Sequence, residues 1–491
     1  MANNDNFTIS PRDAQWREEL RKAKTAKERS AIPRAIMPEL DPTYRVTTMN
    51  AEVNQGLSQD QAVMEATRCL DCPDPGCVTG CPVGINIPGF IKNIERENFK
   101  DAAITLKETS ALPAVCGRVC PQEKQCESRC LYNKMKKAPV AIGWLERFAA
   151  DRDNDGSTAE ELPSQQASNG IKVAVVGSGP AGLSFAGDMA RKGYDITVFE
   201  VLHEIGGVLK YGIPEFRLPN EVVDREIDAL RRLGVKFETN VLVGKTYSYD
   251  DLLSMNFKGI FVASGAGLPR FMGIPGENLI GVMSSNEYLT RINLMGAGRP
   301  GYATPILTGK TVAVIGGGNT AMDSVRTARR MGAQRAIIVY RRSEEEMPAR
   351  IEEVKHAKEE CVEFLTLHNP IEYLPDEKGR VRTMRLQKME LGKPDESGRR
   401  SPVPIEGSIE DIDVDVVIVS VGVSPNPLIP DSISGLETTR RGTLVVDESL
   451  CTTMPLIYAG GDIVRGGATV ILAMGDGRAA ALAMHDKLNG R

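Results

Sequence analysis

Apolar, β-branched runs that end in glycine recur along the chain after about residue 170. The run Val173–Val176 leads into a GxGxxG motif at residues 177–182. A segment with helical periodicity follows, and a second apolar run spans Ile196–Phe199. Short strands that alternate with helices in this way are typical of βαβ units in parallel sheets. The pattern therefore predicts an α/β fold with a dinucleotide-binding unit at residues 171–200.

The three glycines of this motif have separate physical roles. Gly177 permits a tight turn, Gly179 lets the backbone approach a pyrophosphate, and Gly182 allows the helix to pack closely on the strand. Pro180 and Ala181 open the helix, whose free N–H groups then meet the phosphates. A glycine turn without a ligand is the alternative interpretation, but it does not account for both strands, the helix and the acid that follows them.

The acid is Glu200, which follows the glycines by about twenty residues and is placed to accept hydrogen bonds from ribose hydroxyls. No arginine pair comes directly after it, so this unit is expected to bind a nucleotide with free ribose hydroxyls, such as FAD. The next stretch, GGVLKYGIPEF, is rich in glycine. Gly207 and Lys210 within it are expected beside the flavin, and an ordinary loop is the alternative.

A second unit begins at Thr311, where strand, glycine turn, helix and strand recur in the same order. Its turn is the variant fingerprint that ends in alanine, so a second nucleotide site is predicted. The residues assigned to this turn and to the start of its helix are Gly316, Gly318, Asn319, Thr320 and Ala321.

Arg341 and Arg342 follow the last strand of this second unit, at the place where an NAD site would have an acid. A guanidinium here suits the 2′-phosphate of NADP, because it forms forked, charge-assisted hydrogen bonds. A solvated pair on the surface is the alternative. We therefore expect the second unit to bind NADPH.

Further apolar strands end in small residues on either side of the second unit. Gly265 closes one of them, and Gly461 and Asp462 close another just ahead of an alanine-rich helix. Asp462 is placed to bind a ribityl hydroxyl while the start of that helix faces the flavin. The order of these pieces predicts two Rossmann-like domains, the NADP domain being inserted in the FAD domain.

Length and composition set the broad class. The 491 residues have room for about three domains. The expected divisions are a helical domain at 1–150, a linker at 151–168, an FAD-binding domain in two parts at 169–285 and 410–491, and an NADPH-binding domain at 286–409. The net charge of −5 and the lack of a basic stripe argue against a nucleic-acid partner. Without a membrane-length apolar run or a signal-peptide pattern, we expect no membrane partner and a cytoplasmic protein.

Eight of the ten cysteines fall between Cys69 and Cys130. In a reducing compartment, this density is typical of metal ligands rather than disulfides. Zinc sites usually present two separated pairs, so the spacing favours iron–sulfur clusters and leaves zinc as the alternative. The first quartet is Cys69, Cys72, Cys77 and Cys81, and the second is Cys116, Cys120, Cys126 and Cys130.

Taken together, these stretches resemble one family over nearly the whole chain from about residue 35. In order they are the cysteine run, LPAVCGRVCPQEKQCESRC, GSGPAGL, GGVLKYGIPEFRLP, GGGNTAMD, RRSEEEMPA and AGGD. The chain resembles the small (beta) subunits of NADPH-dependent glutamate synthase, which are FAD and iron–sulfur pyridine nucleotide oxidoreductases. It is also similar to one subunit of the electron-bifurcating ferredoxin:NADP oxidoreductases and to the N-terminal half of dihydropyrimidine dehydrogenase.

The resemblance implies FAD at the first unit, NADPH at the second and two [4Fe–4S] clusters in the N-terminal domain. By position, it assigns one cluster to Cys69, Cys72, Cys77 and Cys130. It assigns the other to Cys81, Cys120, Cys126 and Glu146, where relatives supply an oxygen ligand, and it leaves Cys116 spare. From the sequence alone, Glu146 would be interpreted as a solvated helix residue.

A hydride carries two electrons and a cluster accepts one, so a flavin between them meets a chemical requirement. The resemblance implies an electron-input subunit that oxidises NADPH and serves a large subunit, which makes glutamate from glutamine and 2-oxoglutarate. The alternatives are the NADPH-binding subunit of a bifurcating ferredoxin oxidoreductase and a regulatory module with structural zinc. Beyond residue 130 only Cys361 and Cys451 occur, well apart, so no redox disulfide is expected at the flavin.

Overall fold

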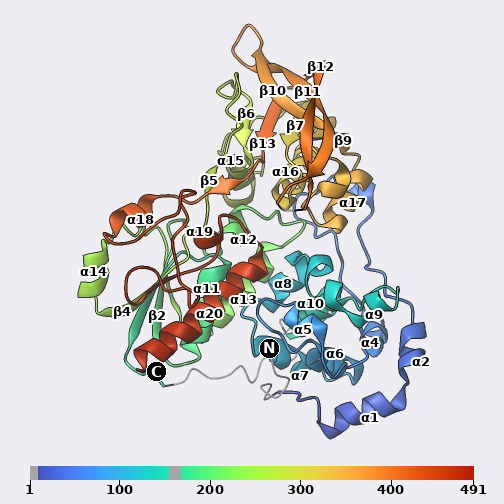
Figure 1. The fold of residues 1–491 in the computed structure, drawn as a ribbon, viewed down its shortest axis with the longest axis vertical. Coiled ribbons are helices and arrows are strands. Elements are labelled where there is room, and N and C mark those ends of the chain that lie inside the picture. The colour runs from blue at the N-terminus through green and yellow to red at the C-terminus, as the bar shows by residue number, and fades with distance from the viewer. Residues whose placement is uncertain (1–8, 154–166, 397, 491) are drawn as a thin grey trace.

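The computed structural model describes residues 9–153, 167–396 and 398–490 (Figure 1). Most of the expected linker at 151–168 lies outside the described residues, and its first residues continue a helix that ends at Arg152. In Figure 1 the N-terminal helices form one body, drawn in blue, beside the first nucleotide unit, and the second nucleotide unit lies above both.

The N-terminal domain is helical, as the sequence predicts, and residues 9–153 contain no strand element. At the start of α4, Gln61 N donates to Ser58 Oγ over 3.3 Å and Ser58 N donates to Gln61 Oε1 over 2.9 Å, which is a capping box. The helices are α1 (Gln15–Ala23), α2 (Ala26–Ala31), α3 (Pro42–Arg45), α4 (Gln59–Thr67), α5 (Gly76–Thr79), α6 (Ile87–Glu95), α7 (Phe99–Lys107), α8 (Pro113–Val119), α9 (Leu131–Lys134) and α10 (Ile142–Arg152).

The first nucleotide unit is built on a parallel sheet covered by α11 and α20. Phe185 of α11 stacks on Phe261 of the sheet, with ring centroids 4.3 Å apart. A Cβ at Gly477 would lie 2.2 Å from the carbonyl oxygen of Ala181, so glycine is needed where these helices meet. The strand order is β15 (Ile457–Ala459), β4 (Phe257–Val262), β1 (Lys172–Val176), β2 (Asp195–Phe199) and β3 (Lys236–Glu238). The helices are α11 (Pro180–Ala190), α12 (Val208–Tyr211), α13 (Asn220–Arg232), α14 (Tyr249–Ser254), α18 (Leu428–Ser432), α19 (Asp462–Arg465) and α20 (Val470–Leu488).

The second nucleotide unit repeats this plan and adds an antiparallel sheet. Its parallel strands lie in the order β6 (Val282–Ser284), β13 (Val416–Val419), β7 (Thr311–Ile315), β8 (Arg335–Tyr340) and β9 (Glu363–Thr366). The antiparallel strands are β10 (His368–Pro375), β11 (Val381–Pro394) and β12 (Arg400–Asp413). The helices are α15 (Ser285–Leu289), α16 (Asn319–Arg330) and α17 (Ile351–Glu359).

The insertion of the second unit into the first is visible in the strand pairing. Strand β15 comes after the second unit in the chain and pairs with β4 of the first sheet. The expected boundaries need correction, because β6 and β13 both belong to the second sheet. The second unit therefore extends beyond 286–409 at both ends, to before Val282 and after Val419. A buried apolar run fits either parallel sheet, so its sequence pattern cannot assign it to one of them. The two units are joined by a ribbon of β5 (Leu268–Pro269) and β14 (Val423–Ser424).

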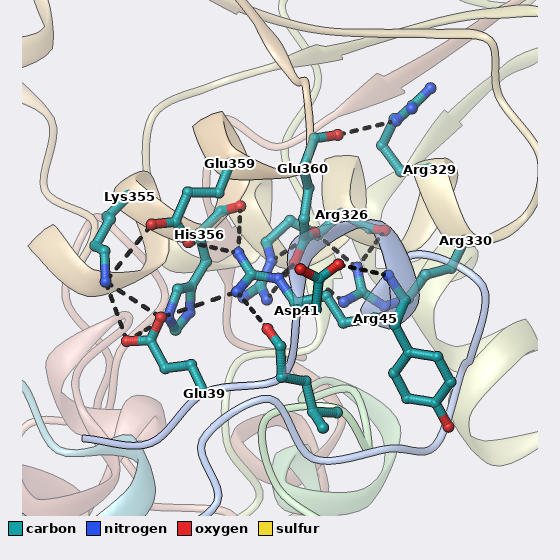
Figure 2. Close-up of polar contacts among 12 residues, drawn as sticks. Glu39, Asp41, Arg45, Arg326, Arg329, Arg330, Lys355, His356, Glu359 and Glu360 are labelled. Carbon is teal, nitrogen blue, oxygen red and sulfur yellow. Dashed lines mark hydrogen bonds and ion pairs between the residues drawn. The ribbon is translucent and has the colours of Figure 1, made fainter.

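The segment before α4 crosses from the helical domain to α17 of the second unit, where it is held by ion pairs (Figure 2). The buried Arg45 side chain donates to Glu360 Oε1 from Nε and to Glu359 Oε2 from Nη2, each over 2.8 Å. Glu39 in turn pairs with Lys355 over 3.1 Å. Breaking a buried pair leaves an unpaired charge at high cost, so these contacts tie the helical domain to the second unit. Among the described helices, none is long and apolar enough to cross a membrane.

Candidate functional site

A cavity of about 1050 Å³ lies where the first unit faces the second. It is at the upper end of the size range of ligand pockets in proteins. The structure brings many of the predicted residues to its wall. Those from the first unit are Gly177, Gly179, Pro180, Ala181, Glu200, Gly207, Gly265, Gly461 and Asp462, and those from the second are Asn319 and Thr320.

The glycines of the first motif have the geometry that a dinucleotide site needs. Gly177 has a φ of +103°, and a Cβ there would lie 2.4 Å from the carbonyl oxygen of Ala263. At Gly182 a Cβ would lie 2.1 Å from the carbonyl oxygen of Gly177. At Gly179, by contrast, a Cβ would meet no heavy atom within 4 Å. The open side of Gly179 faces the cavity at the start of α11, where free N–H groups suit a pyrophosphate.

Glu200 is held in one orientation at the cavity wall. Its Oε2 accepts hydrogen bonds from the backbone N of Ser178 over 2.9 Å and from Ser178 Oγ over 2.5 Å. Its Oε1 accepts one from Leu202 N over 2.9 Å. A carboxylate has about four acceptor positions, so one on Oε1 is left for a ribose hydroxyl. The sequence did not indicate the role of Ser178, which occupies a variable position of the motif.

The start of α20 also faces the cavity. Asp462 Oδ1 accepts from Ala468 N over 2.8 Å, and burial raises the pKa of Asp462. Gly461 N donates to Asp476 Oδ2 over 2.9 Å. Thr469 caps α20 by accepting from Leu472 N over 3.3 Å. Asp476, which sequence reasoning missed, thus holds the turn that carries Gly461 and Asp462 against the cavity.

The second glycine motif is built like the first. Gly316 has a φ of +139°, and a Cβ there would lie 2.3 Å from the carbonyl oxygen of Ser420. A Cβ at Gly318 would meet no heavy atom within 4 Å. Asn319 Oδ1 accepts from Arg350 N over 2.9 Å, and the buried Ala321 packs in the core of the unit. Gly182, Gly316, Gly318 and Ala321 shape the two motifs but are not part of the cavity wall.

The structure gives the two predicted arginines different surroundings. Arg342 is buried, and it donates to the carbonyl oxygen of Arg400 over 2.8 Å and to Asp395 Oδ2 over 2.6 Å. Arg341 is exposed, and its side chain makes no ion pair or hydrogen bond within the described part of the chain. The charge of Arg342 is therefore already balanced, whereas that of Arg341 is available to a ligand.

Two basic residues near the first site have partners that the sequence did not reveal. Lys210 Nζ pairs with Glu204 over 3.0 Å and with Asp224 over 2.6 Å, and Lys210 is not part of the cavity wall. The charge of Lys210 is therefore already paired, and its place beside the flavin stays a prediction. Arg217 does line the cavity, and its Nη1 donates to both carboxylate oxygens of Asp323 over 2.7 and 2.8 Å. This pair joins the two nucleotide units across the cavity wall.

Four cysteines form an outer group of thiols: Cys69, Cys72, Cys77 and Cys130. The pKa of the Cys77 thiol is raised well above its ordinary value, first by burial and then by Cys69, Cys130 and Cys72. The four side chains are thus near enough for their charges to act on one another. The outer group therefore matches the ligand set that the resemblance implies for the first cluster. Four cysteine thiolates are the usual donor set of a [4Fe–4S] cluster.

The inner group lines a small cavity of about 20 Å³, and consists of Cys81, Cys120, Cys126 and Glu146. Glu146 Oε1 is buried and has no hydrogen-bond partner among the described residues. Burial, with a smaller effect from Glu226, raises the pKa of Glu146 to about 8. A buried carboxylate oxygen without a partner, facing three thiols, fits an oxygen ligand to a metal cluster. It does not fit the solvated helix residue that the sequence alone suggested.

Cys116 lies next to this inner group, and a hydrogen bond with the Cys120 thiol, together with burial, raises the pKa of the Cys116 thiol well above its ordinary value. It is buried, it is not part of the small cavity, and its Sγ lies 3.4 Å from Met474 Sδ of α20. From the spacing alone, Cys116 is the first cysteine of the second quartet. The assignment that leaves Cys116 spare stays a prediction.

The inner thiol group and the large cavity share a wall. Cys120 lines the small cavity, while its neighbours Val119 and Pro121 line the large one. Similarly, Ile471 lines the small cavity and Val470 the large one. The large cavity therefore adjoins the inner group, and none of the outer cysteines lines the large cavity.

Two facing nucleotide units with a shared cavity, next to two thiol groups, define a pyridine-nucleotide oxidoreductase with iron–sulfur clusters. The family model for pyridine nucleotide-disulphide oxidoreductases matches residues 171–477. The model described as dihydropyrimidine dehydrogenase domain II, 4Fe-4S cluster, matches residues 45–158. The small chain of NADPH glutamate synthase from Azospirillum brasilense is 36% identical over 457 residues, which are 91% of this chain and 94% of that one. The chain belongs to the family of glutamate synthase [NADPH] small chains.

The chain is also similar to a subunit of another enzyme and to a solved structure. The NADP(+)-dependent formate dehydrogenase subunit beta of Moorella thermoacetica is 37% identical, over 84% of this chain but only 60% of that subunit. The structure of Mycobacterium tuberculosis FprA in complex with NADPH superposes with a TM-score of 0.56 at 20% identity, covering 65% of this chain and 85% of that one. This second similarity supports the fold alone. The cofactors of the chain are FAD, NADPH and [4Fe–4S] clusters, and the lining of the large cavity and the donor side chains of the two thiol groups fit them.

Proposed function

We propose that this chain is the electron-input subunit of an NADPH-dependent glutamate synthase, with a large subunit that makes glutamate from glutamine and 2-oxoglutarate. The wall shared by the large cavity and the inner thiol group is the observation that carries this proposal. It supports a continuous route from the nucleotide sites towards the outer thiols. A cytoplasmic location is proposed with it, because eight clustered thiols need a reducing compartment.

Each group of residues has a place in this proposal. The first unit would hold FAD with the Gly179 turn, Glu200 and Asp462, and the second would hold NADPH with the Gly318 turn and Arg341. The outer and inner groups would hold one [4Fe–4S] cluster each. When bound, these groups supply hydride transfer from the nicotinamide to the flavin and single-electron transfer through the clusters.

The chain itself contributes binding and orientation rather than acid–base chemistry. The pair of Arg217 and Asp323 is buried, and burial raises the pKa of Asp323 to about 6 although Arg217 opposes this. By joining α16 to the loop before α13, the pair fixes the second unit relative to the first. Fixed orientation of two reactants removes an entropic cost from their reaction. The apolar residues between the two cavities, Val119 and Val470 among them, keep water out of the route.

The runner-up is a dehydrogenase or bifurcating ferredoxin oxidoreductase that uses the same module. Identities of 36% to a glutamate synthase small chain and 37% to a formate dehydrogenase subunit do not separate the two functions. The share of each relative that this chain covers favours glutamate synthase. The chain spans 94% of the glutamate synthase small chain but only 60% of the formate dehydrogenase subunit.

The test mixes anaerobically purified chain, loaded with its cofactors, with the glutamate synthase large chain of the same organism, glutamine, 2-oxoglutarate and NADPH. We expect NADPH-dependent glutamate formation that requires both chains. Absence of glutamate, together with NADPH-dependent ferredoxin reduction coupled to NADH in the presence of the other candidate partner, would support the runner-up instead.

Substituting Arg341 with alanine is expected to raise the KM for NADPH about tenfold to a hundredfold and to leave the KM for NADH nearly unchanged. The reason is the loss of a charge-assisted hydrogen bond to the 2′-phosphate, which contributes about 1.5–3 kcal/mol. Steady-state reduction of an artificial acceptor with each nucleotide measures both constants.

The matched control is Arg335→Ala at the opposite end of the same strand, where Arg335 pairs with Glu363 on the surface. This variant should keep the NADPH preference of the unaltered chain. If the Arg341 and Arg335 variants prefer NADPH equally, the assignment of Arg341 is incorrect.

A further inference from the structure

The outer thiol group lies close to the protein surface. All four outer cysteines, Cys69, Cys72, Cys77 and Cys130, are partly exposed, whereas in the inner group only Cys81 is partly exposed and Cys120 and Cys126 are buried. The rate of electron transfer between proteins falls steeply with distance. An acceptor protein must therefore approach the outer group rather than the inner one.

A basic loop, residues 128–138, borders this outer group directly after Cys130. It carries Arg129, Lys134, Lys136 and Lys137, and no acidic residue occurs from 128 to 145, although the chain as a whole has a net charge of −5. Lys134 and Lys136 are exposed, and their side chains make no ion pair or hydrogen bond within the described residues. Lys137 donates to the carbonyl oxygen of Ser30 over 2.7 Å, which holds the end of the loop against α2.

The same loop exposes two large apolar side chains. Leu131 and Met135 are each 41% exposed, and they are four residues apart along α9 and its C-terminal cap. Residues with this spacing lie on one side of a helix. Tyr132 points the other way: it is buried and donates to the carbonyl oxygen of Arg68 over 2.7 Å. Tyr132 thus holds the loop on the helical domain, and the loop presents two apolar residues surrounded by cations, an arrangement like the apolar centre and polar rim of protein interfaces.

We propose that the basic loop is the docking surface for the protein that accepts electrons from this chain, and that the matching face of that protein is acidic. The proposal rests on the proposed function, since it takes the outer group as the point of electron exit. Unpaired cations attract an acidic partner over about a Debye length and so accelerate its association. The apolar residues at the centre would then be covered in the complex.

The test compares the Lys134→Glu/Lys136→Glu variant with the unaltered chain, with the purified glutamate synthase large chain as the probe. Binding is measured anaerobically by biolayer interferometry at several salt concentrations. We expect the affinity at low salt to fall at least about tenfold and the salt dependence to weaken. The matched control is Lys236→Glu/Lys245→Glu, which reverses two exposed lysines of the first nucleotide unit and should bind as the unaltered chain does.

The outcomes separate this inference from the proposed function. If the unaltered chain does not bind the large chain at all, the proposed function fails, and the docking surface fails with it. If the unaltered chain binds but both double variants bind equally well, the function stands and the basic loop is not the docking surface. Iron content and the NADPH-dependent reduction of a small dye should be the same in all three proteins, which shows that the variants are intact.

Discussion

Replacement of Cys77 with serine is expected to remove the iron and labile sulfide of one cluster and to lower electron delivery to the partner protein at least about a hundredfold. Burial raises the pKa of the Cys77 thiol, and the other three outer thiols raise it further. Loss of residues that only support a ligand already lowers metal affinity or activity by about 10–100-fold, so the loss of a ligand itself should cost more. NADPH-dependent reduction of a small dye that accepts electrons at the flavin should persist, because none of the outer cysteines lines the large cavity.

The measurement is iron and sulfide content together with the two activities. Cys361→Ser is the matched control, because Cys361 is exposed and lies in the second nucleotide unit, outside both thiol groups. It should retain the full iron content and both activities. Delivery to the partner that survives in the Cys77 variant would mean that the outer cluster is not on the route.

A second large effect is expected at the first glycine motif, where two alanine substitutions should act differently. At Gly182, a Cβ would lie 2.1 Å from the carbonyl oxygen of Gly177, so alanine forces α11 away from the sheet. Overpacking of this kind destabilises a protein by about 1–3 kcal/mol and should also displace the phosphate-binding N–H groups. At Gly179, a Cβ would occupy open space and φ is −69°, so alanine leaves the fold intact and blocks only the ligand.

The flavin-free forms of both variants show the difference. We expect Gly182→Ala to lower the melting temperature of the flavin-free protein and to abolish FAD retention. For Gly179→Ala we expect an unchanged melting temperature without flavin and an FAD affinity at least about tenfold weaker, since an interaction worth about 1.4 kcal/mol changes affinity by this factor. Equal melting temperatures for the two flavin-free variants would contradict the assigned roles of the two glycines.

The parts of the structure that sequence reasoning predicted correctly depend on local backbone requirements. Gly177 and Gly316 have positive φ, and Gly182 and Gly477 stand where a side chain would collide with backbone. Such requirements leave a signal in residue type and spacing. The two nucleotide units and their glycine motifs could therefore be recognised.

The features that sequence reasoning missed depend on partners distant in the chain. Lys210 and Arg342 carry the charge that the sequence suggested, but Asp224 and Asp395 neutralise it. The pairing of Arg217 with Asp323 joins residues 106 positions apart, and no periodicity reveals it. In the same way, β13 is apolar enough for either sheet, so only its pairing with β7 shows where the second unit ends.

The cysteine domain lies between these two cases. Spacing pointed to clusters, but a simple division into two quartets would have grouped Cys81 with Cys69 and counted Cys116 as a ligand. The structure places Cys81 with Cys120, Cys126 and Glu146 instead. The division agrees with the resemblance and not with the order of the cysteines along the chain. This division arises because the chain passes from the outer group to the inner group along α5 and the residues that follow it.

The proposed function depends above all on one chain carrying a nucleotide-reducible flavin beside two iron–sulfur clusters. The most direct measurement is the flavin, iron and acid-labile sulfide content of anaerobically purified protein, followed by titration with NADPH under visible absorbance. We predict one FAD and two four-iron clusters per chain, and loss of the flavin band as NADPH is added. Protein that contains zinc without sulfide, or whose bound flavin NADPH does not reduce, would contradict the account.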